Sequence, residues 1–263
     1  MSRNPEPKLM AHMVAGYPDM DTSLEVARAL VDGGASYIEL QFPFSDPSAD
    51  GPAIQAACST ALDRGFHLDP GFELVETIRK DLGAEVFLMS YASPVFALGV
   101  ERFVRRAADL GVRGLIVPDL PFDRDEGLYA AGREAGVAAV PVAVVTLPEQ
   151  RLERIVELSP PYLYASLRRG ITGTETQIGE ENLRFLDRFK QTGIEVMAGF
   201  GINNRRQVEA LTGHAETVVV GSALVRTITD AIQRGRSVYR DVRKKVAELI
   251  GGEGGGDNAE GDS

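Results

Sequence analysis

The chain has one cysteine, no tryptophan and no long hydrophobic run among its 263 residues. The single Cys58 excludes an intramolecular disulfide framework, and no Cys/His cluster has the spacing of a zinc site. No apolar run approaches the roughly 20 residues that span a bilayer. The N-terminal MSRNPEPK also lacks the apolar stretch of a secretory signal. We therefore expect a cytoplasmic protein that binds neither a metal nor a membrane.

Basic charge is also scarce, because 28 Lys and Arg stand against 38 Asp and Glu, for a formal net charge of −10. This excess of acid argues against a nucleic-acid-binding surface and against a basic helix on a membrane. Part of it lies in residues 251–263, GGEGGGDNAEGDS, which hold six glycines and four acids. That composition buries too little surface to offset its ordering entropy, so we predict a disordered tail.

Apolar, β-branched runs alternate with amphipathic stretches over residues 1–250. Eight runs are strand candidates: 9–15, 37–42, 85–90, 114–118, 138–145, 162–167, 195–199 and 217–220. Eight successive strand–helix units fit a closed (β/α)8 barrel or an open doubly wound sheet. The count, the spacing and a length near roughly 250 residues favour one α/β domain, a TIM barrel over 1–250. No Gly-x-Gly-x-x-Gly follows the first strand, which weakens the dinucleotide-binding alternative.

Helix ends are marked by local signals. Thr22 and Glu25 have the spacing of a capping box before a helix that stops at Gly33. Pro52 suits a first helical position. The apolar pattern predicts an extra helix at about 70–81, between the second and third strands.

In a barrel, chemistry belongs at the C-terminal ends of the strands. Glu39 and Gln41 share one face of the second strand. If one of them points toward the mouth of the barrel, at the C-terminal ends of the strands, so does the other. Burial beside apolar neighbours would favour a protonated Glu39, as a general acid requires. An inert buried carboxyl is the alternative. Asp50 lies in a proline-bounded loop, where it either meets a ligand or stabilises a turn.

Glycine-bearing loops follow the last three strands: Gly170-Ile171-Thr172-Gly173, Gly199-Phe200-Gly201 and Gly221-Ser222. Glycines let backbone approach an anion closely, and helix N-termini offer free N–H groups. Taken together, the three loops predict a phosphate site, although each glycine alone is also typical of a tight turn.

Other side chains have simpler interpretations. His12, in the first strand, is typical of a satisfied core histidine. Tyr91 and Tyr164 end the third and sixth strands, where they either border the mouth or pack beside it. Cys58 is expected to be a small buried side chain.

The segment IELQFPFSDPSADGPAIQAA (38–57) closely resembles the signature of the tryptophan synthase alpha chain family. The likeness extends over about residues 8–248. It includes HMVAGYP (12–18), LMSYASPVF (88–96), GLIVPDLPF (114–122), RRGITG (168–173), GFGI (199–202) and VVGSALV (219–225). The PFSDPSADGP run is highly specific, whereas the glycine loops are shared with many phosphate-binding barrels.

The resemblance implies a carbon–carbon lyase that cleaves indole-3-glycerol phosphate to indole and glyceraldehyde 3-phosphate. It implies that Glu39 and Asp50 are the catalytic carboxylates, with Glu39 protonating indole C3 and also able to accept a hydroxyl proton. The implied substrate contacts are Tyr91, Tyr164, Thr172, Gly173, Phe200, Gly201, Gly221 and Ser222. It further implies no cofactor in this chain. The implied partner is a beta chain that carries pyridoxal phosphate, in an alpha2-beta2 tetramer that makes tryptophan.

One departure and two alternatives remain. Gln41 stands where the family usually has glycine, and its amide is expected to bond a carboxylate such as Glu39, a tyrosine hydroxyl or water. An indole-glycerol phosphate synthase or a phosphosugar isomerase is the nearest enzymatic alternative, but the synthase should have a lysine at a strand mouth. A non-catalytic activator of a beta chain is the other, and the presence of both Glu39 and Asp50 argues against it.

Overall fold

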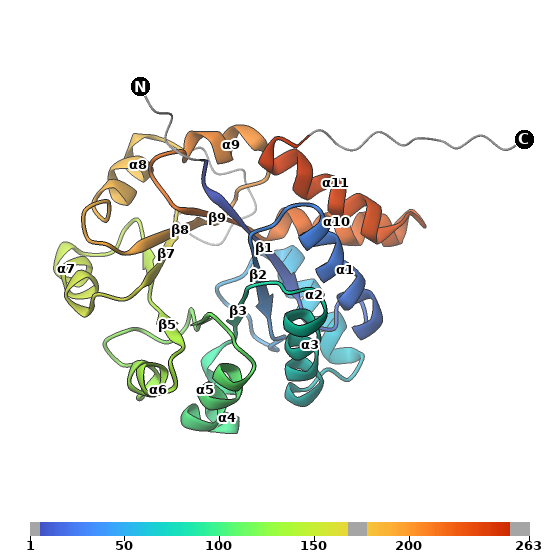
Figure 1. Cartoon of the computed structure of the whole chain (residues 1–263), viewed down its shortest axis with the longest axis horizontal. Helices are drawn as coiled ribbons and strands as arrows, with labels where there is room; N and C mark the ends of the chain where they lie inside the picture. The colour runs from blue at the N-terminus through green and yellow to red at the C-terminus, as the bar shows by residue number, and fades with distance from the viewer. Residues whose placement is uncertain (1–5, 168–177, 253–263) are drawn as a thin grey trace, which may run out of the picture.

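The computed structural model describes residues 6–167 and 178–252, in which strands alternate with helices that surround them (Figure 1). The strands are β1 (Lys8–Val14), β2 (Tyr37–Gln41), β3 (Val86–Met89), β4 (Gly114–Ile116), β5 (Ala138–Val140), β6 (Val142–Val144), β7 (Tyr162–Ser166), β8 (Glu195–Gly199) and β9 (Thr217–Val220). The helices are α1 (Met20–Asp32), α2 (Pro52–Asp63), α3 (Leu68–Asp81), α4 (Ala92–Leu98), α5 (Val100–Asp109), α6 (Leu128–Ala135), α7 (Glu149–Leu158), α8 (Glu180–Asp187), α9 (Arg205–Ala210), α10 (Ser222–Gln233) and α11 (Val238–Ile250).

The strands form one parallel sheet in the order β5-β4-β3-β2-β1-β9-β8-β7-β6, and its two edge strands are consecutive in the chain. The run predicted as one strand, 138–145, is divided at Pro141 into β5, which pairs with β4, and β6, which pairs with β7. Proline has no N–H to donate to the ladder, which explains the break. The Pro141 carbonyl still accepts from the Tyr164 amide at 2.9 Å. The two edges therefore meet, and the predicted (β/α)8 barrel is confirmed.

The connection from β2 to β3 contains α2 and α3, so the extra helix predicted at 70–81 is confirmed. Pro52 is the first residue of α2, also as predicted. The capping box predicted at Thr22 and Glu25 is wrong. The N-cap of α1 is Asp19, which has an extended φ of −156° and accepts from the Thr22 amide at 2.8 Å. Thr22 already lies inside the helix.

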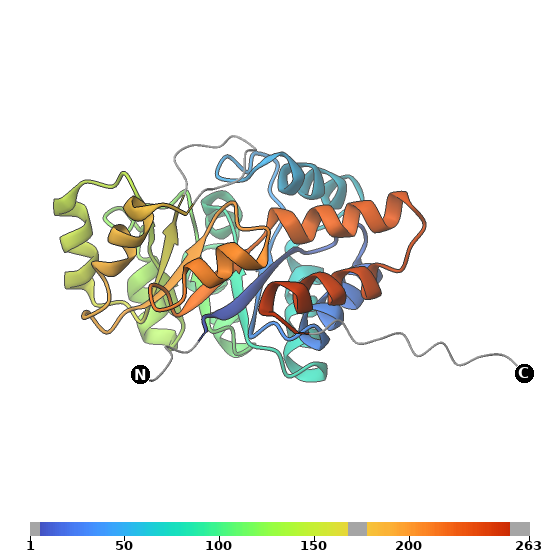
Figure 2. The same cartoon turned by 90° about the horizontal axis from the view of Figure 1, so that it is seen from above.

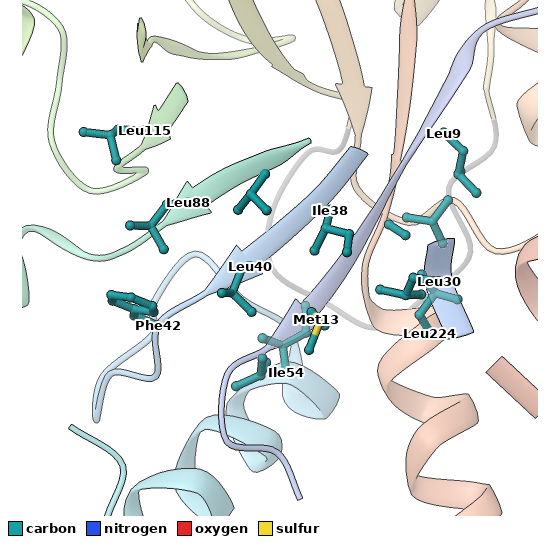
Figure 3. Packing of buried hydrophobic residues seen from close by; sticks show 14 of the residues in the cluster. Leu9, Met13, Leu30, Ile38, Leu40, Phe42, Ile54, Leu88, Leu115 and Leu224 are labelled. Atoms are coloured by element: carbon teal, nitrogen blue, oxygen red, sulfur yellow. The ribbon is translucent and has the colours of Figure 1, made fainter. Parts of the chain in front are cut away.

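Side chains on the strands alternate between two layers. One layer packs against the surrounding helices, as Figure 3 shows for Ile38 and Leu40 of β2 and for Leu224 of α10. The other fills the barrel interior, and its buried members are Met10, Tyr37, Phe87, Met89, Tyr91, Ile116, Val140, Tyr162, Tyr164, Met197 and Val219. His12 and Glu39 come two positions after Met10 and Tyr37 on their strands. They therefore form the next interior layer, toward the C-terminal ends of the strands.

The last two helices complete the wall. α10 lies between α2 and α11 (Figure 2), and α11 also packs on α1. α11 ends at Ile250, where Gly251 has a φ of 75°. The division into a barrel over 1–250 and a tail over 251–263 stays a prediction, since residues 253–263 lie outside those described. No helix in the described ranges is both long and apolar enough to cross a bilayer.

Candidate active site

A cavity opens at the C-terminal ends of the strands and measures about 1090 Å³ together with its opening to solvent. Its wall comes from β1, β2 and β7 and from the segments that follow β2, β8 and β9. The lining residues include His12, Glu39, Asp50, Tyr164, Phe200, Gly201, Gly221, Ser222 and Arg226. The structure therefore brings both predicted carboxylates and most of the predicted substrate contacts to one cavity.

Glu39 reaches the cavity beside His12, its register partner on β1. The Nδ1 atom of His12 lies 2.7 Å from Oε2 of Glu39, and only 3% and 5% of the two side chains are exposed. Burial favours a neutral imidazole, but the hydrogen bond and the charge of Glu39 outweigh it and raise the pKa of His12. The interpretation of His12 as a satisfied core histidine is wrong in one respect. Its Nε2 has no hydrogen-bond partner among the described residues.

Asp50 ends the loop that leads into α2, and only 5% of its surface is exposed. Its Oδ2 accepts two hydrogen bonds of 2.8 Å, one from Nε2 of Gln41 and one from the Tyr91 hydroxyl. No described residue donates to Oδ1, so this oxygen is available to a ligand. Burial raises the pKa of Asp50, while the charge of His12 and the two donors oppose that shift.

Gln41 is tied to Asp50 and not to Glu39. Its side chain is completely buried, and its Nε2 also lies 3.4 Å from Sγ of Cys58. The expected carboxylate partner is confirmed, but the hypothesis that it is Glu39 is wrong, because the Gln41 amide donates to Oδ2 of Asp50. Cys58 is buried as predicted, and burial raises the pKa of its thiol to about 12.

The two predicted tyrosines have different places. Tyr164 lines the cavity edge-on to the Phe200 ring, with 6.1 Å between centroids, and burial raises its pKa. Tyr91 is fully buried and stacks on Phe44 at 5.4 Å. Its hydroxyl accepts from the Ala49 amide at 3.1 Å as it donates to Asp50. Tyr91 therefore positions Asp50, and its predicted contact with substrate stays a prediction.

The N-terminus of α10 forms another part of the wall. Gly221 is its N-cap and Ser222 its first residue. The Leu224 amide donates to the Gly221 carbonyl at 2.9 Å, which is the first internal bond of the helix. The amides of Ser222 and Ala223 precede that bond and are the free donors of a helix N-terminus, where the dipole favours an anion.

The segment after β8 lies next to this helix end. Phe200 and Gly201 have φ of 78° and 77°, in a region that side-chain-bearing residues rarely adopt. Such strain at Phe200 is typical of ligand sites. The other two predicted contacts, Thr172 and Gly173, lie outside the described residues.

Sequence reasoning missed Arg226. It follows Ser222 by one turn of α10 and is the only lysine or arginine among the described lining residues. No described acid forms an ion pair with it. The i, i+4 spacing from Ser222 puts both side chains on one face of the helix, and this is the signal that would have found it.

Comparison with known proteins identifies the family. The model of the tryptophan synthase alpha chain family matches residues 1–251. The chain belongs to this family. The tryptophan synthase alpha chain of Helicobacter hepaticus is 34% identical over 255 residues, which cover 94% of this chain and 95% of that one. Tryptophan synthase from Mycobacterium tuberculosis has a TM-score of 0.84 at 32% identity, covering 94% and 92% of the two chains. The tryptophan synthase complex from Pyrococcus furiosus gives 0.82 at 34%, covering 95% and 100%.

Membership of the tryptophan synthase alpha chain family confirms the resemblance found in the sequence. In the parts of the chain that the structure describes, no three His, Cys, Asp or Glu side chains are grouped to hold a metal ion. The prediction that this family member binds no cofactor of its own stays a prediction.

Proposed function

We propose that this tryptophan synthase alpha family member cleaves the C3–C3′ bond of indole-3-glycerol phosphate, releasing indole and glyceraldehyde 3-phosphate. One observation carries the proposal: Glu39, Asp50 and the helix N-terminus at Gly221 and Ser222 border the same cavity. These supply an acid, a hydrogen-bond acceptor and an anion site. No lysine is among the described lining residues, which disfavours an indole-glycerol phosphate synthase.

Glu39 is the proposed acid. Indole leaves poorly as a C3 carbanion, so C3 takes a proton before the bond breaks. The Glu39 carboxyl is buried in the cavity wall, where a bound indole ring rather than water would be its acceptor. The reaction therefore begins with proton transfer from Glu39 to C3.

Asp50 is the proposed acceptor of the indole N1–H. Protonation at C3 develops positive charge at N1, and a carboxylate held in place stabilises that charge without reorganisation. Gln41 and Tyr91 hold Oδ2, so Oδ1 is the oxygen that faces this task. The two carboxyl groups then divide the work, since Glu39 gives a proton to C3 and Asp50 accepts the hydrogen bond of N1–H.

The phosphate group is proposed to bind the amides of Ser222 and Ala223 at the start of α10. The helix dipole and the close backbone approach at Gly201 and Gly221 favour an anion there. Arg226 adds a full positive charge to the same side of the cavity. Substrate is thus oriented with its indole toward the carboxylates.

Family membership supports a beta chain as the partner, in an alpha2-beta2 tetramer in the cytoplasm. We propose that this beta chain uses pyridoxal phosphate to join the released indole to serine. The alpha chain residues described above would only make indole, and the tryptophan would form on the partner.

The test is to incubate the purified chain with indole-3-glycerol phosphate, with and without a beta chain, and to measure indole. We expect indole and glyceraldehyde 3-phosphate in equal amounts, and a large loss in Asp50→Asn. Asp63→Asn, the same change at the exposed end of α2, is the control and should behave as wild type. A folded chain that releases no indole in either arm contradicts the proposal.

A further inference from the structure

His12 occupies a position that the proposed mechanism does not use. It follows Met10 by two residues on β1, so it faces the barrel interior one layer above that buried side chain. Its register partner on β2 is Glu39. On the other side of β1, β9 leads into Gly221, and a Cβ at that glycine would lie 3.5 Å from Cγ of His12. The imidazole therefore stands between the proposed acid and the start of the proposed anion site.

The two ring nitrogens of His12 have different surroundings. Nδ1 lies 2.7 Å from Oε2 of Glu39. Nε2 is buried and has no hydrogen-bond partner in the described parts of the chain. Buried polar atoms in folded proteins nearly always have a partner. Because His12 lines the cavity, a ligand bound there is the partner that this geometry provides.

We propose that His12 is a catalytic residue of the lyase. Its Nε2 accepts the proton of the glycerol hydroxyl on the carbon that becomes the aldehyde, and its Nδ1 returns a proton to Glu39. This inference rests on the proposed function. The resemblance found in the sequence implies that Glu39 performs both the acid step and the base step. In this inference Glu39 performs the acid step, and His12, which is hydrogen-bonded to it, performs the base step.

The protons balance over the cycle. Before cleavage, Oε1 of Glu39 carries one proton and Nδ1 of His12 carries another. The Glu39 proton goes to C3 of the indole and the hydroxyl proton goes to Nε2. The electrons of the C3–C3′ bond return to the indole ring, and the C3′–O bond becomes the aldehyde. A glutamate and an imidazolium remain. Transfer of the Nδ1 proton to Oε2 of Glu39 restores the acid and leaves the neutral imidazole with its proton on Nε2. Once the products leave, proton exchange with solvent water frees Nε2 and returns the protons to Oε1 of Glu39 and Nδ1 of His12.

The groups that face His12 come from several elements. Glu39 on β2 and Asp50 before α2 place negative charge near the ring, and Tyr164 on β7 and Arg226 on α10 border the same cavity. Burial opposes an imidazolium, but the carboxylates outweigh it, so the pKa of His12 lies above its usual value. An imidazolium beside an ionised Glu39 holds the same two protons as a neutral imidazole beside a protonated Glu39, which is the form that reacts. The His12–Glu39 pair therefore loses its first proton at a higher pH than a solvated histidine does. Loss of this proton is expected to give the basic limb of the pH profile.

His12→Asn separates proton transfer from positioning. The Asn amide can donate to Glu39 in place of Nδ1, but it carries no proton to or from substrate. We expect kcat for indole release to fall roughly 10²-fold, as for other acid–base groups, with KM within a few-fold. The basic limb of kcat/KM should move to lower pH. His67→Asn, the same change at an exposed histidine, is the control and should leave both unchanged.

His12→Ala gives an independent measure. Added imidazole should restore part of the lost kcat in this variant and none in His12→Asn, because only the smaller side chain leaves room for a free base. Thermal unfolding checks that both variants fold. Nitrogen NMR of the wild-type protein adds a readout that needs no variant, since the Nε2 signal of His12 should shift when both products bind.

Three results would overturn the inference: wild-type kcat and pH profile in folded His12→Asn, no rescue by imidazole in folded His12→Ala, or an unchanged Nε2 signal. Each of these results is compatible with normal indole release by the wild-type chain. A wild-type chain that releases no indole is a different result, because it removes the lyase function itself.

Discussion

The side chain of Gln41 is bound to Asp50, with Nε2 of the amide 2.8 Å from Oδ2 of the carboxylate. Tyr91 donates to the same oxygen at the same distance. Strand β2 thus fixes both proposed carboxylates, since it carries Glu39 directly and holds Asp50 through Gln41. The two donors also oppose the effect of burial, which alone would favour a protonated Asp50.

Replacing Gln41 should change how Asp50 titrates. A lost donor to the carboxylate raises the pKa of Asp50 further, so the ionised form that accepts the indole N1–H is reached only at higher pH. In Gln41→Gly and in the better-filled Gln41→Met, we expect the acidic limb of kcat/KM to move upward with KM within a few-fold. Indole release measured across pH tests this.

Gln55→Met is the matched control for Gln41. Gln55 also donates to Asp50, but to the backbone carbonyl at 2.9 Å and not to the carboxylate. In Gln55→Met, the acidic limb of kcat/KM should coincide with that of wild type. If both variants shift the limb equally, the cause is displacement of the loop, and if Gln41→Met does not shift it, Gln41 does not tune Asp50.

Glu39→Gln should abolish the acid step while keeping the shape of the site. The Gln side chain can still bond Nδ1 of His12, but it has no proton for C3. We expect kcat to fall by roughly 10²–10⁴-fold, the range of general acid–base groups, with little change in binding of a substrate analogue. Glu195→Gln, the same change at the N-terminal end of β8 and away from the cavity, should keep wild-type turnover. Near-normal turnover in a folded Glu39→Gln would remove Glu39 from the mechanism.

The contrast between Asp50 and His12 shows what the sequence could reveal. Asp50 lies in a specific local signature, and barrel strands follow from apolar runs, so both were predictable. The His12–Glu39 bond joins residues 27 positions apart and depends on the register of β1 and β2, which no local pattern encodes. Arg226 was missed for another reason, because its helix face points to the cavity only once the barrel has closed. Pro141 splits a strand that apolar periodicity alone treats as continuous.

Gly221 should tolerate alanine better than valine. A Cβ at this position would lie 3.4 Å from Cδ1 of Ile54 and 3.5 Å from Cγ of His12, which are ordinary contacts. The two further methyl groups of valine would press on these side chains or enter the cavity. We expect KM within a few-fold in Gly221→Ala and roughly tenfold higher or more in Gly221→Val, a loss of about 1.4 kcal/mol of binding.

Inorganic phosphate gives a second readout for Gly221. A ligand that binds only the folded state raises the unfolding temperature, so phosphate should stabilise wild type and Gly221→Ala but not Gly221→Val. Equal stabilisation of all three would show that these glycines serve only the turn.

Arg226 should contribute to binding of the substrate phosphate and not to bond cleavage. It is the only lysine or arginine among the described lining residues, one helical turn from Ser222, and its side chain is largely exposed, so solvent weakens its attraction for an anion. In Arg226→Gln we expect KM about tenfold higher, equivalent to about 1.4 kcal/mol, with kcat unchanged. Arg226→Lys should recover part of the lost binding, because lysine restores the positive charge but not the planar guanidinium that binds two phosphate oxygens at once.

Arg234→Gln, at the exposed C-terminal end of α10, is the control for general electrostatics. The measurement is KM at two ionic strengths. If KM rises with salt in wild type and rises less in Arg226→Gln, Arg226 contacts the phosphate. An identical KM in the Arg226 and Arg234 variants contradicts it.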